Sequence, residues 1–303
     1  MSELRFDNRV AVITGAGRGL GRSYALLLAA RGAKVVVNDP GAGMKGDGVD
    51  AGPAEEVVQE IKAAGGEAVA NTDSVATPEG GQSIIDTAMN TFGRVDILIH
   101  NAGIVRRATL DEISVDDFES VLDVHLRGGF HVLRAAFPHM KKAGYGRVVM
   151  TGSINGLYGN EGVANYSVAK AGLMGLSNVT ALEGAEHNIK SNVILPAAVT
   201  RMSEGVDTSA FPPMDPNQVA PAVGWLAHES CSVTGEMLIS AAGRVARAYV
   251  SETAGVYQPE WTIEQVGEQI DNIRNADDTK TFSTVPSGHL DHLRFSFEMA
   301  SKG

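Results

Sequence analysis

Short apolar runs recur along the chain, and each is followed by a stretch in which apolar residues return at helical intervals. Residues 9–15 (RVAVITG) predict a buried strand, and residues 21–33 predict a helix with Tyr24 and Leu28 on one face and Gly32 at its end. Further strands are predicted at residues 34–39, 67–74, 95–103, 147–153, 191–196 and 235–243. Alternating strands and helices form right-handed βαβ units. The pattern predicts an α/β fold with a doubly wound parallel sheet of about seven strands and helices on both faces.

Three stretches depart from this alternation, and we expect the first 243 residues to form one domain. Residues 40–54 are rich in glycine and predict a surface loop. Residues 200–218 are a long insertion after a strand, a kind of segment that can cover a site. Residues 244–303 predict an extension with one helix that packs on the domain or is partly flexible. Thr262 and Gln265 form a capping box for that helix. Its apolar stripe consists of Ile263, Val266, Ile270 and Ile273.

Composition and charge describe an ordinary globular protein that acts on small molecules. Hydrophobic residues make up 44% of the chain, and no apolar run reaches membrane-spanning length. A net charge of −11 disfavours a nucleic-acid or anionic-membrane surface. The single cysteine, Cys231, excludes an internal disulfide and is interpreted as a small buried side chain. No signal-peptide layout and no peroxisomal address occur at the ends, so a cytoplasmic location is expected, with no metal ion.

A run of glycines, TGAGRGLGR, joins the first predicted strand to the first helix. Gly15, Gly19 and Gly21 fit the spacing Gly-x-x-x-Gly-x-Gly, and only glycine lets the backbone turn this tightly beside a ligand. The free N–H groups and positive dipole end of the following helix favour a pyrophosphate. A glycine-rich turn can also be purely structural. Its position after the first strand favours a dinucleotide.

Asp39 ends the second predicted strand, about twenty residues after the glycine run. A carboxylate at this place accepts both hydroxyls of the adenosine ribose and repels a 2′-phosphate. The alternative is an aspartate that caps the following turn. Together with the glycines, Asp39 predicts NAD as the cofactor and disfavours NADP.

Five segments then occur in the order typical of short-chain dehydrogenases/reductases, and the chain resembles this family from residue 8 to about residue 243. They are TGAGRGLG, HNAG at 100–103, Ser153, YSVAK at 166–170 and PAAVT at 196–200. Within the family the chain resembles the (3R)-3-hydroxyacyl-CoA dehydrogenase module of peroxisomal multifunctional enzymes of type 2, and stand-alone actinobacterial homologues. The resemblance implies a Rossmann-type fold, NAD, and a homodimer or homotetramer built on two long helices.

Tyr166 and Lys170 lie one helical turn apart, within side-chain reach of each other. The bland alternative is a packed aromatic beside a solvated lysine. A lysine ammonium and the positive nicotinamide ring would stabilise the phenolate and lower the pKa of Tyr166, which could then take the proton of an alcohol. Lys170 can also hold the nicotinamide ribose. Ser153, at the end of a predicted strand, could polarise the same substrate oxygen.

His125 stands where the family usually has an asparagine that holds a proton-relay water. A histidine could bind the same water or relay protons itself, and the alternative is a structural histidine in a long helix. His100, His131 and His139 are interpreted as surface or packing residues. Ala197 replaces a glycine usual in the family. The resemblance implies that further residues contact the cofactor: Arg18, Leu20, Asp73, Ser74, Asn101, Gly103, Pro196, Val199 and Thr200.

The sequence therefore predicts NAD-dependent oxidation of a secondary alcohol, with a (3R)-3-hydroxyacyl-CoA as the leading substrate. A 17β-hydroxysteroid or a steroid side-chain CoA thioester remains an alternative with the same chemistry. Reduction of a 3-oxoacyl carrier protein would favour NADP, against Asp39. From a different class, the chain could be a catalytically silent NAD-binding regulator, but intact Ser153, Tyr166 and Lys170 argue against it.

Overall fold

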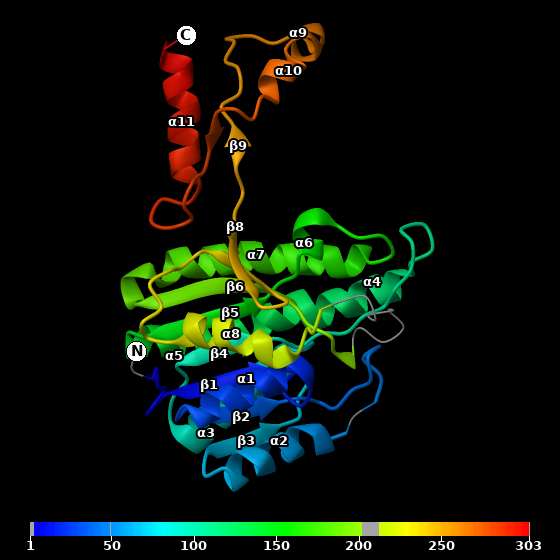
Figure 1. The fold of residues 1–303 in the computed structure, drawn as a ribbon, viewed down its shortest axis with the longest axis vertical. Helices are drawn as coiled ribbons and strands as arrows, with labels where there is room; N and C mark the ends of the chain where they lie inside the picture. The colour runs from blue at the N-terminus through cyan, green and yellow to red at the C-terminus, as the bar shows by residue number, and fades with distance from the viewer. Residues whose placement is uncertain (1–2, 49, 202–211, 303) are drawn as a thin grey trace.

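The computed structural model describes residues 3–48, 50–201 and 212–302, and these contain one large, twisted sheet (Figure 1). Within the described residues the sheet has eight strands in the order β3-β2-β1-β4-β5-β6-β7-β8, parallel except for the β7–β8 pair. The predicted doubly wound parallel fold is confirmed. The strands are β1 (Val10–Thr14), β2 (Lys34–Asn38), β3 (Glu67–Asn71), β4 (Ile97–His100), β5 (Gly146–Thr151), β6 (Ile189–Ala197), β7 (Met237–Ala241) and β8 (Arg244–Ala248).

The eighth strand, β8, carries the sheet beyond residue 243, where we predicted the last strand to end. Ala242 and Gly243 have positive φ angles of 48° and 80°. Two such residues make the tight hairpin turn that joins antiparallel strands. Alanine is rare in this conformation, so the turn carries little sequence signal. The chain leaves the sheet after Ala248, and a domain division near residue 243 stays a prediction.

Helices cover both faces of the sheet, as predicted. One face carries α1 (Gly19–Ala30), α2 (Gly52–Ala63) and α8 (Ala220–Ala227). The other face carries α3 (Pro78–Phe92), α5 (Gly128–Ala143) and α7 (Ala164–Gly184). The helix α4 (Val115–Leu122) runs through a π-helical turn over Asp123–Arg127 into α5, and α6 (Asn155–Tyr158) precedes α7.

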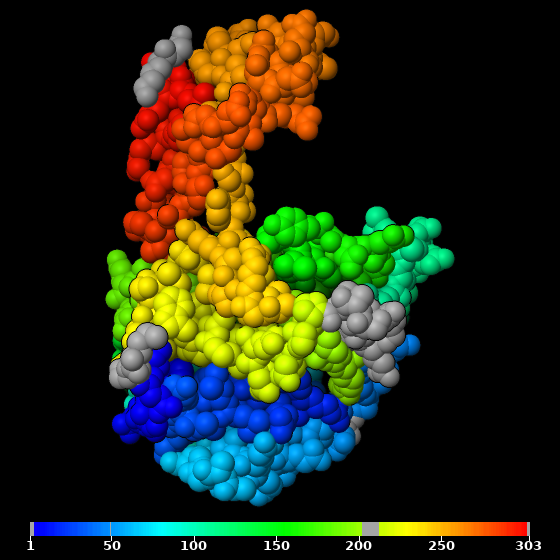
Figure 2. Space-filling model, viewed as in Figure 1, coloured from blue at the N-terminus to red at the C-terminus, as the bar shows by residue number. Residues whose placement is uncertain are grey.

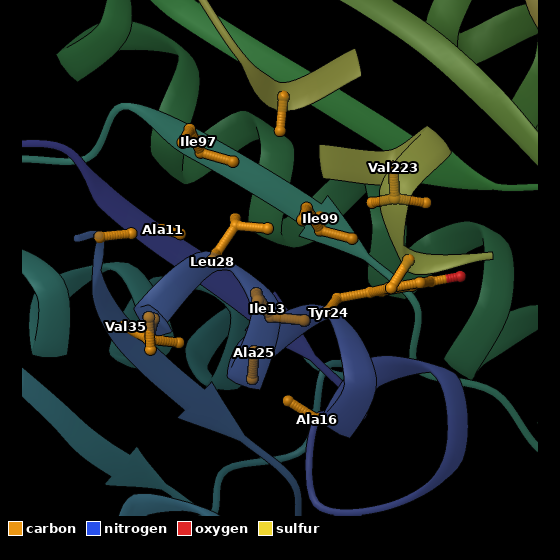
Figure 3. Packing of buried hydrophobic residues seen from close by; sticks show 14 of the residues in the cluster. Ala11, Ile13, Ala16, Tyr24, Ala25, Leu28, Val35, Ile97, Ile99 and Val223 are labelled. Carbon is orange, nitrogen blue, oxygen red and sulfur yellow. The ribbon is translucent and has the colours of Figure 1, made fainter. Parts of the chain in front are cut away.

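Each face of the sheet packs a separate apolar core under its helices. Figure 3 shows Leu28 of α1 and Val223 of α8 in the same cluster as Ile13 and Ile99 of the central strands. All four side chains are fully buried, and each such burial stabilises the fold by about 1.5–3 kcal/mol. Because central strands are covered on both faces, they read as continuous apolar runs, which made them predictable.

A buried guanidinium closes the amino end of the sheet, opposite the carboxyl ends of the parallel strands. Arg147 is 2% exposed, and its guanidinium donates to four backbone carbonyls at 2.7–3.2 Å. The guanidinium carbon, Cζ, lies 4.5 Å from the ring centroid of Tyr145. The acceptors are the carbonyl oxygens of Gly146, Asn188, His228 and Glu229. One side chain thus joins the start of β5 to the segments before β6 and after α8.

Replacing Arg147 by methionine is expected to lower the free energy of unfolding by about 3 kcal/mol. Methionine keeps most of the apolar stem but leaves four buried acceptors without a donor. Thermal unfolding followed by circular dichroism measures the loss. Arg294→Met, at a side chain that is 66% exposed, serves as the control and should leave the midpoint unchanged. An unaltered midpoint in Arg147→Met would contradict this account.

Most of the extension after Ala248 stands away from the sheet domain (Figures 1 and 2), but Thr284 Oγ1 donates to the carbonyl oxygen of Gly235 at 3.3 Å. Within the described residues it holds three helices where we predicted one: α9 (Ile263–Glu268), α10 (Ile270–Ile273) and α11 (His289–Lys302). The capping box of Thr262 and Gln265 is present, but the predicted helix breaks at Gln269, after the weak helix former Gly267. Three of its four apolar stripe residues are exposed, and Ile263 keeps 88% of its surface. A two-stranded sheet, β9 (Glu252–Thr253) with β10 (Thr279–Lys280), holds the extension together.

Two of the three irregular stretches border the carboxyl ends of the strands. The glycine-rich stretch is shorter than predicted, because α2 already begins at Gly52. Most of the insertion at 200–218, namely residues 202–211, lies outside the described residues. Its end includes a short 3-10 helix over Pro216–Gln218. Within the part of the chain that the structure describes, no helix is long and apolar enough to cross a membrane.

Candidate active site

Nine of the residues that we predicted to contact the cofactor line one cavity of about 290 Å³. The cavity opens where β1, β2 and β4 end, at the point where the strand order reverses on either side of β1, the usual ligand site in such sheets. The nine residues are Gly15, Arg18, Gly19, Leu20, Asp39, Ser74, Asn101, Gly103 and Thr200.

The glycine run forms a tight turn into α1, for reasons that the geometry makes explicit. Gly15 and Gly19 have positive φ angles of 63° and 54°. A Cβ on Gly21 would lie 2.2 Å from the carbonyl oxygen of Gly15 and 2.6 Å from Nδ2 of Asn101. Gly21 therefore lets α1 pack on the turn rather than lining the cavity. Asn101 donates from Nδ2 to the same Gly15 oxygen, at 3.0 Å, and so ties the end of β4 to the turn.

Asp39 holds backbone groups with both of its carboxylate oxygens. Oδ1 accepts from the N–H of Gly41 at 2.8 Å, and Oδ2 accepts from the N–H of Gly17 at 2.9 Å. The turn-capping role that we considered as the alternative is therefore present. Each carboxylate oxygen keeps a second lone pair, and Asp39 lines the cavity. Recognition of ribose by Asp39 stays a prediction beside the structural role.

Besides Gly21, Tyr166 and Lys170, three more predicted cofactor residues do not line this cavity. The Asp73 carboxylate accepts from Ser83 Oγ at 2.6 Å and from Asn71 Nδ2 at 3.1 Å, so neighbouring side chains hold it. Pro196 lies within β6, and Val199 donates its N–H to the carbonyl oxygen of Met214, within the insertion, at 2.7 Å. The roles that we assigned to these residues stay predictions. Ala197 continues β6 beside Ala241 of β7, so the change from glycine leaves the strand regular.

Ser153, Tyr166 and Lys170 come together at the ends of β5 and α7. Ser153 follows β5 and hydrogen-bonds the Tyr166 hydroxyl. The Lys170 Nζ lies 5.4 Å from the centroid of the Tyr166 ring and donates to Thr151 O at 2.6 Å. Lys170 is 3% exposed, so the bland alternative of a solvated lysine is wrong. Burial lowers the pKa of Lys170 to about 7.

The pKa of Tyr166 departs from our expectation. In the protein alone, burial raises the pKa of Tyr166 above its ordinary value, and Ser153 and Arg107 partly offset that rise. We predicted the opposite direction, with Lys170 as a cause. Burial outweighs the favourable contacts because a phenolate loses its hydration, and it drives Lys170 toward its neutral form as well. The nicotinamide contribution to the Tyr166 pKa stays a prediction.

Arg107 is an exposed cation that we did not single out, and its charge lowers the pKa of Tyr166. If Tyr166 takes the proton of an alcohol, as the sequence predicts, the reaction needs its phenolate, and kcat/KM should rise with pH up to the Tyr166 pKa. Arg107→Ala removes the charge and is expected to raise the Tyr166 pKa, which moves the pH profile to the alkaline side. On the acid limb of the profile, kcat/KM should fall by about two- to threefold. Arg107→Lys should keep the native profile. Profiles at low and high salt measure the effect, and identical low-salt profiles for Arg107→Ala and the unaltered protein would contradict it.

His125 lies in the π-helical turn between α4 and α5, with its ring edge-on to Tyr166 at a centroid distance of 5.2 Å. Its Nε2 contacts the backbone of Ile104, 2.8 Å from the oxygen and 3.1 Å from the nitrogen. Its Nδ1 is buried and has no partner among the described residues. Burial lowers the pKa of His125 well below its ordinary value, so the ring is neutral. A Cβ on Gly103 would lie 2.3 Å from this ring, which explains the glycine in HNAG.

His100 has a structural task that sequence reasoning did not specify. Burial lowers the pKa of His100 to about 4, so the ring is neutral. Its Nε2 donates to the carbonyl oxygen of His125 at 2.8 Å, and its Nδ1 accepts from the hydroxyl of Thr14 at 3.0 Å. His100 thereby fixes the π-helical turn on the ends of β1 and β4. The isolated position of the residue in the sequence gave no signal for this contact.

The glycine-rich loop, defined here as residues 40–48, is the largest part of the cavity wall that we missed. We predicted only a surface loop. Its lining residues are Pro40, Ala42, Gly43, Met44, Gly46 and Gly48. Loop composition indicates irregular backbone but not which surface that backbone covers. Among the residues that the structure describes, no group of three or more histidine, cysteine, aspartate or glutamate side chains could hold a metal ion.

A doubly wound sheet with this turn and cavity defines the class of Rossmann-type dinucleotide-binding folds. The family description "short chain dehydrogenase" matches residues 9–209. The chain belongs to the short-chain dehydrogenase family, which is a family of oxidoreductases.

Named relatives narrow the comparison within the family. The peroxisomal multifunctional enzyme type 2 of Drosophila melanogaster is 48% identical over 93% of this chain, and this chain spans 48% of that enzyme. A short-chain type dehydrogenase/reductase of Mycobacterium tuberculosis is 48% identical over 80% of this chain and 85% of its own length. The solved structure of the full-length Drosophila enzyme gives a TM-score of 0.83 at 40% identity, covering 99% of this chain and 50% of the other. The chain thus spans half or less of the type 2 multifunctional enzymes of Drosophila melanogaster and Mus musculus.

Proposed function

We propose that this protein oxidises a secondary alcohol with NAD, and that the alcohol is a (3R)-3-hydroxyacyl-CoA. The observation that carries the proposal is the grouping of Ser153 and Lys170 around Tyr166 at the carboxyl ends of the strands. A silent NAD-binding regulator would have no use for this group, so we do not favour that alternative.

The cavity beside α1 fits a dinucleotide. The first turn of α1 carries no acidic residue and no side-chain cap, so its N–H groups are available to a phosphate. A Cβ on Gly17 would lie 2.9 Å from Oδ2 of Asp39, and a Cβ on Gly19 would lie 3.4 Å from Thr200. Side chains at these two glycines would therefore occupy space beside the turn. Asp39 at the cavity wall favours NAD over NADP, because it would repel a 2′-phosphate. A bound nicotinamide supplies the hydride acceptor that the protein side chains lack.

Each catalytic side chain has a distinct task in the proposed reaction. Tyr166 takes the hydroxyl proton of the substrate as its phenolate, and Ser153 donates a hydrogen bond to the developing oxygen charge. Lys170 lies beside the Tyr166 ring and stabilises the phenolate charge at pH values where the Lys170 amine is protonated. The His125 ring packs beside Tyr166, and its Nδ1, which has no partner among the described residues, is positioned to hold a water that accepts the departing proton.

The names of the relatives support the acyl-CoA assignment. Peroxisomal multifunctional enzymes and hydratase-dehydrogenase-epimerases are 44–50% identical to this chain, whereas a 3-oxoacyl-carrier-protein reductase of Synechocystis is 36% identical. A 17β-hydroxysteroid or steroid side-chain CoA thioester remains the alternative substrate, since the same three side chains would act on it. A cytoplasmic location is part of the proposal, supported by the bacterial relatives.

A homo-oligomer is also proposed, with α5 and α7 as its interface. Both helices present apolar side chains to solvent: Phe130 is 48%, Val168 48% and Val179 51% exposed. Association would bury them, which is favourable. Size-exclusion chromatography with light scattering should give a dimer or tetramer, and a monomer at micromolar concentration would rule this out.

The function is tested by following nicotinamide absorbance with purified protein. NAD or NADP is supplied with (3R)- and (3S)-3-hydroxyacyl-CoAs of graded length, and separately with a 17β-hydroxysteroid. We expect reduction of NAD with the (3R) thioesters only. Turnover with the steroid alone would move the substrate assignment and keep the chemistry. Silence with all substrates, despite NAD binding, would revive the regulator.

A further inference from the structure

The glycine-rich loop (residues 40–48) is folded into a defined shape. Within it, the N–H of Gly43 donates to Asp47 O at 2.7 Å, and at its base the N–H of Asp50 donates to Pro40 O at 2.9 Å. A Cβ on Gly41, whose φ is +69°, would lie 1.7 Å from the backbone carbonyl oxygen of Asp50. The loop therefore closes on itself only because glycine stands at its base.

Among the residues that the structure describes, three hydrogen bonds from distant parts of the chain reach the loop, and each ends on a loop carbonyl. The N–H of Val105 donates to Met44 O at 3.0 Å, Arg106 Nε donates to Lys45 O at 3.0 Å, and Arg201 Nη2 donates to Ala42 O at 3.2 Å. Because the loop contributes backbone carbonyls to these bonds, the positions of the donor groups determine where the loop lies. Two of the three donors come from the segment that follows β4.

Arg106 differs from the other two donors because it also reaches the catalytic helix. Its Nη1 donates to Asp117 Oδ1 of α4 at 2.9 Å, and its carbonyl accepts from Asn165 Nδ2 at 3.0 Å. Asn165 is fully buried and caps the N–H of Tyr166 with Oδ1 at 2.7 Å. One residue thus connects the cavity wall, α4 and the first turn of α7, which carries Tyr166.

We propose that Arg106 is a positioning residue that seats the glycine-rich loop on the bound dinucleotide and holds this loop in register with the Tyr166 turn. The inference rests on the proposed function, since it concerns the same cofactor site. The guanidinium suits this task because its fixed fork serves Lys45 O and Asp117 at once, which a lysine ammonium on a flexible stem does not.

The test compares Arg106→Met and Arg106→Lys with the unaltered protein. The NAD dissociation constant is measured without substrate, and hydrogen exchange is followed in peptides covering the loop and the start of α7. We expect Arg106→Met to weaken NAD binding about tenfold, because Val105 and Arg201 still hold the loop. KM for NAD should rise more than kcat falls, and NAD should no longer slow exchange in the loop. Arg106→Lys can donate to one of the two partners at a time, so its NAD affinity should lie between those of Arg106→Met and the unaltered protein.

Arg294→Met, which removes an exposed arginine–aspartate pair within α11, is the matched control and should change none of these readouts. Native NAD affinity and native loop protection in both Arg106 variants would overturn the inference, as would the same losses in Arg294→Met. If the unaltered protein binds NAD but its loop exchange does not respond, the inference alone fails. If the unaltered protein binds no NAD, the proposed function fails with it.

Discussion

Tyr166→Phe is expected to lower kcat by about a thousandfold while NAD affinity stays within about twofold of the native value. The substitution removes the hydroxyl that hydrogen-bonds Ser153 and keeps the ring that packs edge-on to His125 and under Lys170. The protein therefore loses its proton acceptor without losing the shape of the site. Steady-state rates and NAD titration measure the two quantities separately.

Tyr249→Phe is the matched control, because this tyrosine is 59% exposed at the start of the extension. It should retain native kcat. A Tyr166→Phe protein that keeps more than about a tenth of native kcat would contradict the assignment of Tyr166 as the proton acceptor, since general acid–base groups contribute at least ~10²-fold.

Gly21→Ala is expected to weaken NAD binding by roughly a hundredfold or more, because the added methyl needs about 3 kcal/mol of rearrangement. It would stand 2.2 Å from the carbonyl of Gly15 and 2.6 Å from the side chain of Asn101. The first obstacle is backbone, so either the turn or α1 has to shift. The shift displaces the first-turn N–H groups that we assign to the pyrophosphate.

Gly267→Ala is the control for this prediction, since nothing lies within 4 Å of the position its Cβ would take. It should leave NAD binding unchanged and should slightly stabilise α9. Calorimetric titration with NAD and thermal unfolding together separate lost binding from lost folding. Native NAD affinity in Gly21→Ala would show that the turn does not hold the dinucleotide as described.

The sheet was predictable because strands buried on both faces have continuous apolar sequences. Ile13 and Ile99 lie in runs that are apolar on both faces, as strands covered by helices on two sides must be. The eighth strand was missed because its turn uses Ala242 at positive φ, which composition does not signal. The extension was misjudged because the stripe of Ile263 has helical spacing but is mostly exposed within the described residues, so periodicity alone overstated the helix.

The candidate site was predictable where one residue type is chemically required at a fixed spacing. Tyr166 and Lys170 sit four apart, and Gly15, Gly19 and Gly21 mark the turn. Contacts between segments far apart in sequence were not predictable. Arg106 and His100 act by donating to backbone carbonyls, and a carbonyl leaves no trace in the sequence. The direction of the Tyr166 pKa also depends on burial, which requires the whole fold.

The central claim is that a (3R)-3-hydroxyacyl-CoA is oxidised at the carbon that bears the hydroxyl, with Tyr166 taking the proton. The most direct measurement uses (3R)- and (3S)-substrates that carry deuterium on this carbon, followed by mass spectrometry of the nicotinamide product. The account predicts deuterium in the reduced nicotinamide from the (3R) substrate only, and at least a hundredfold slower appearance with Tyr166→Phe. Deuterium from the (3S) substrate, or an unchanged rate in Tyr166→Phe, would contradict it.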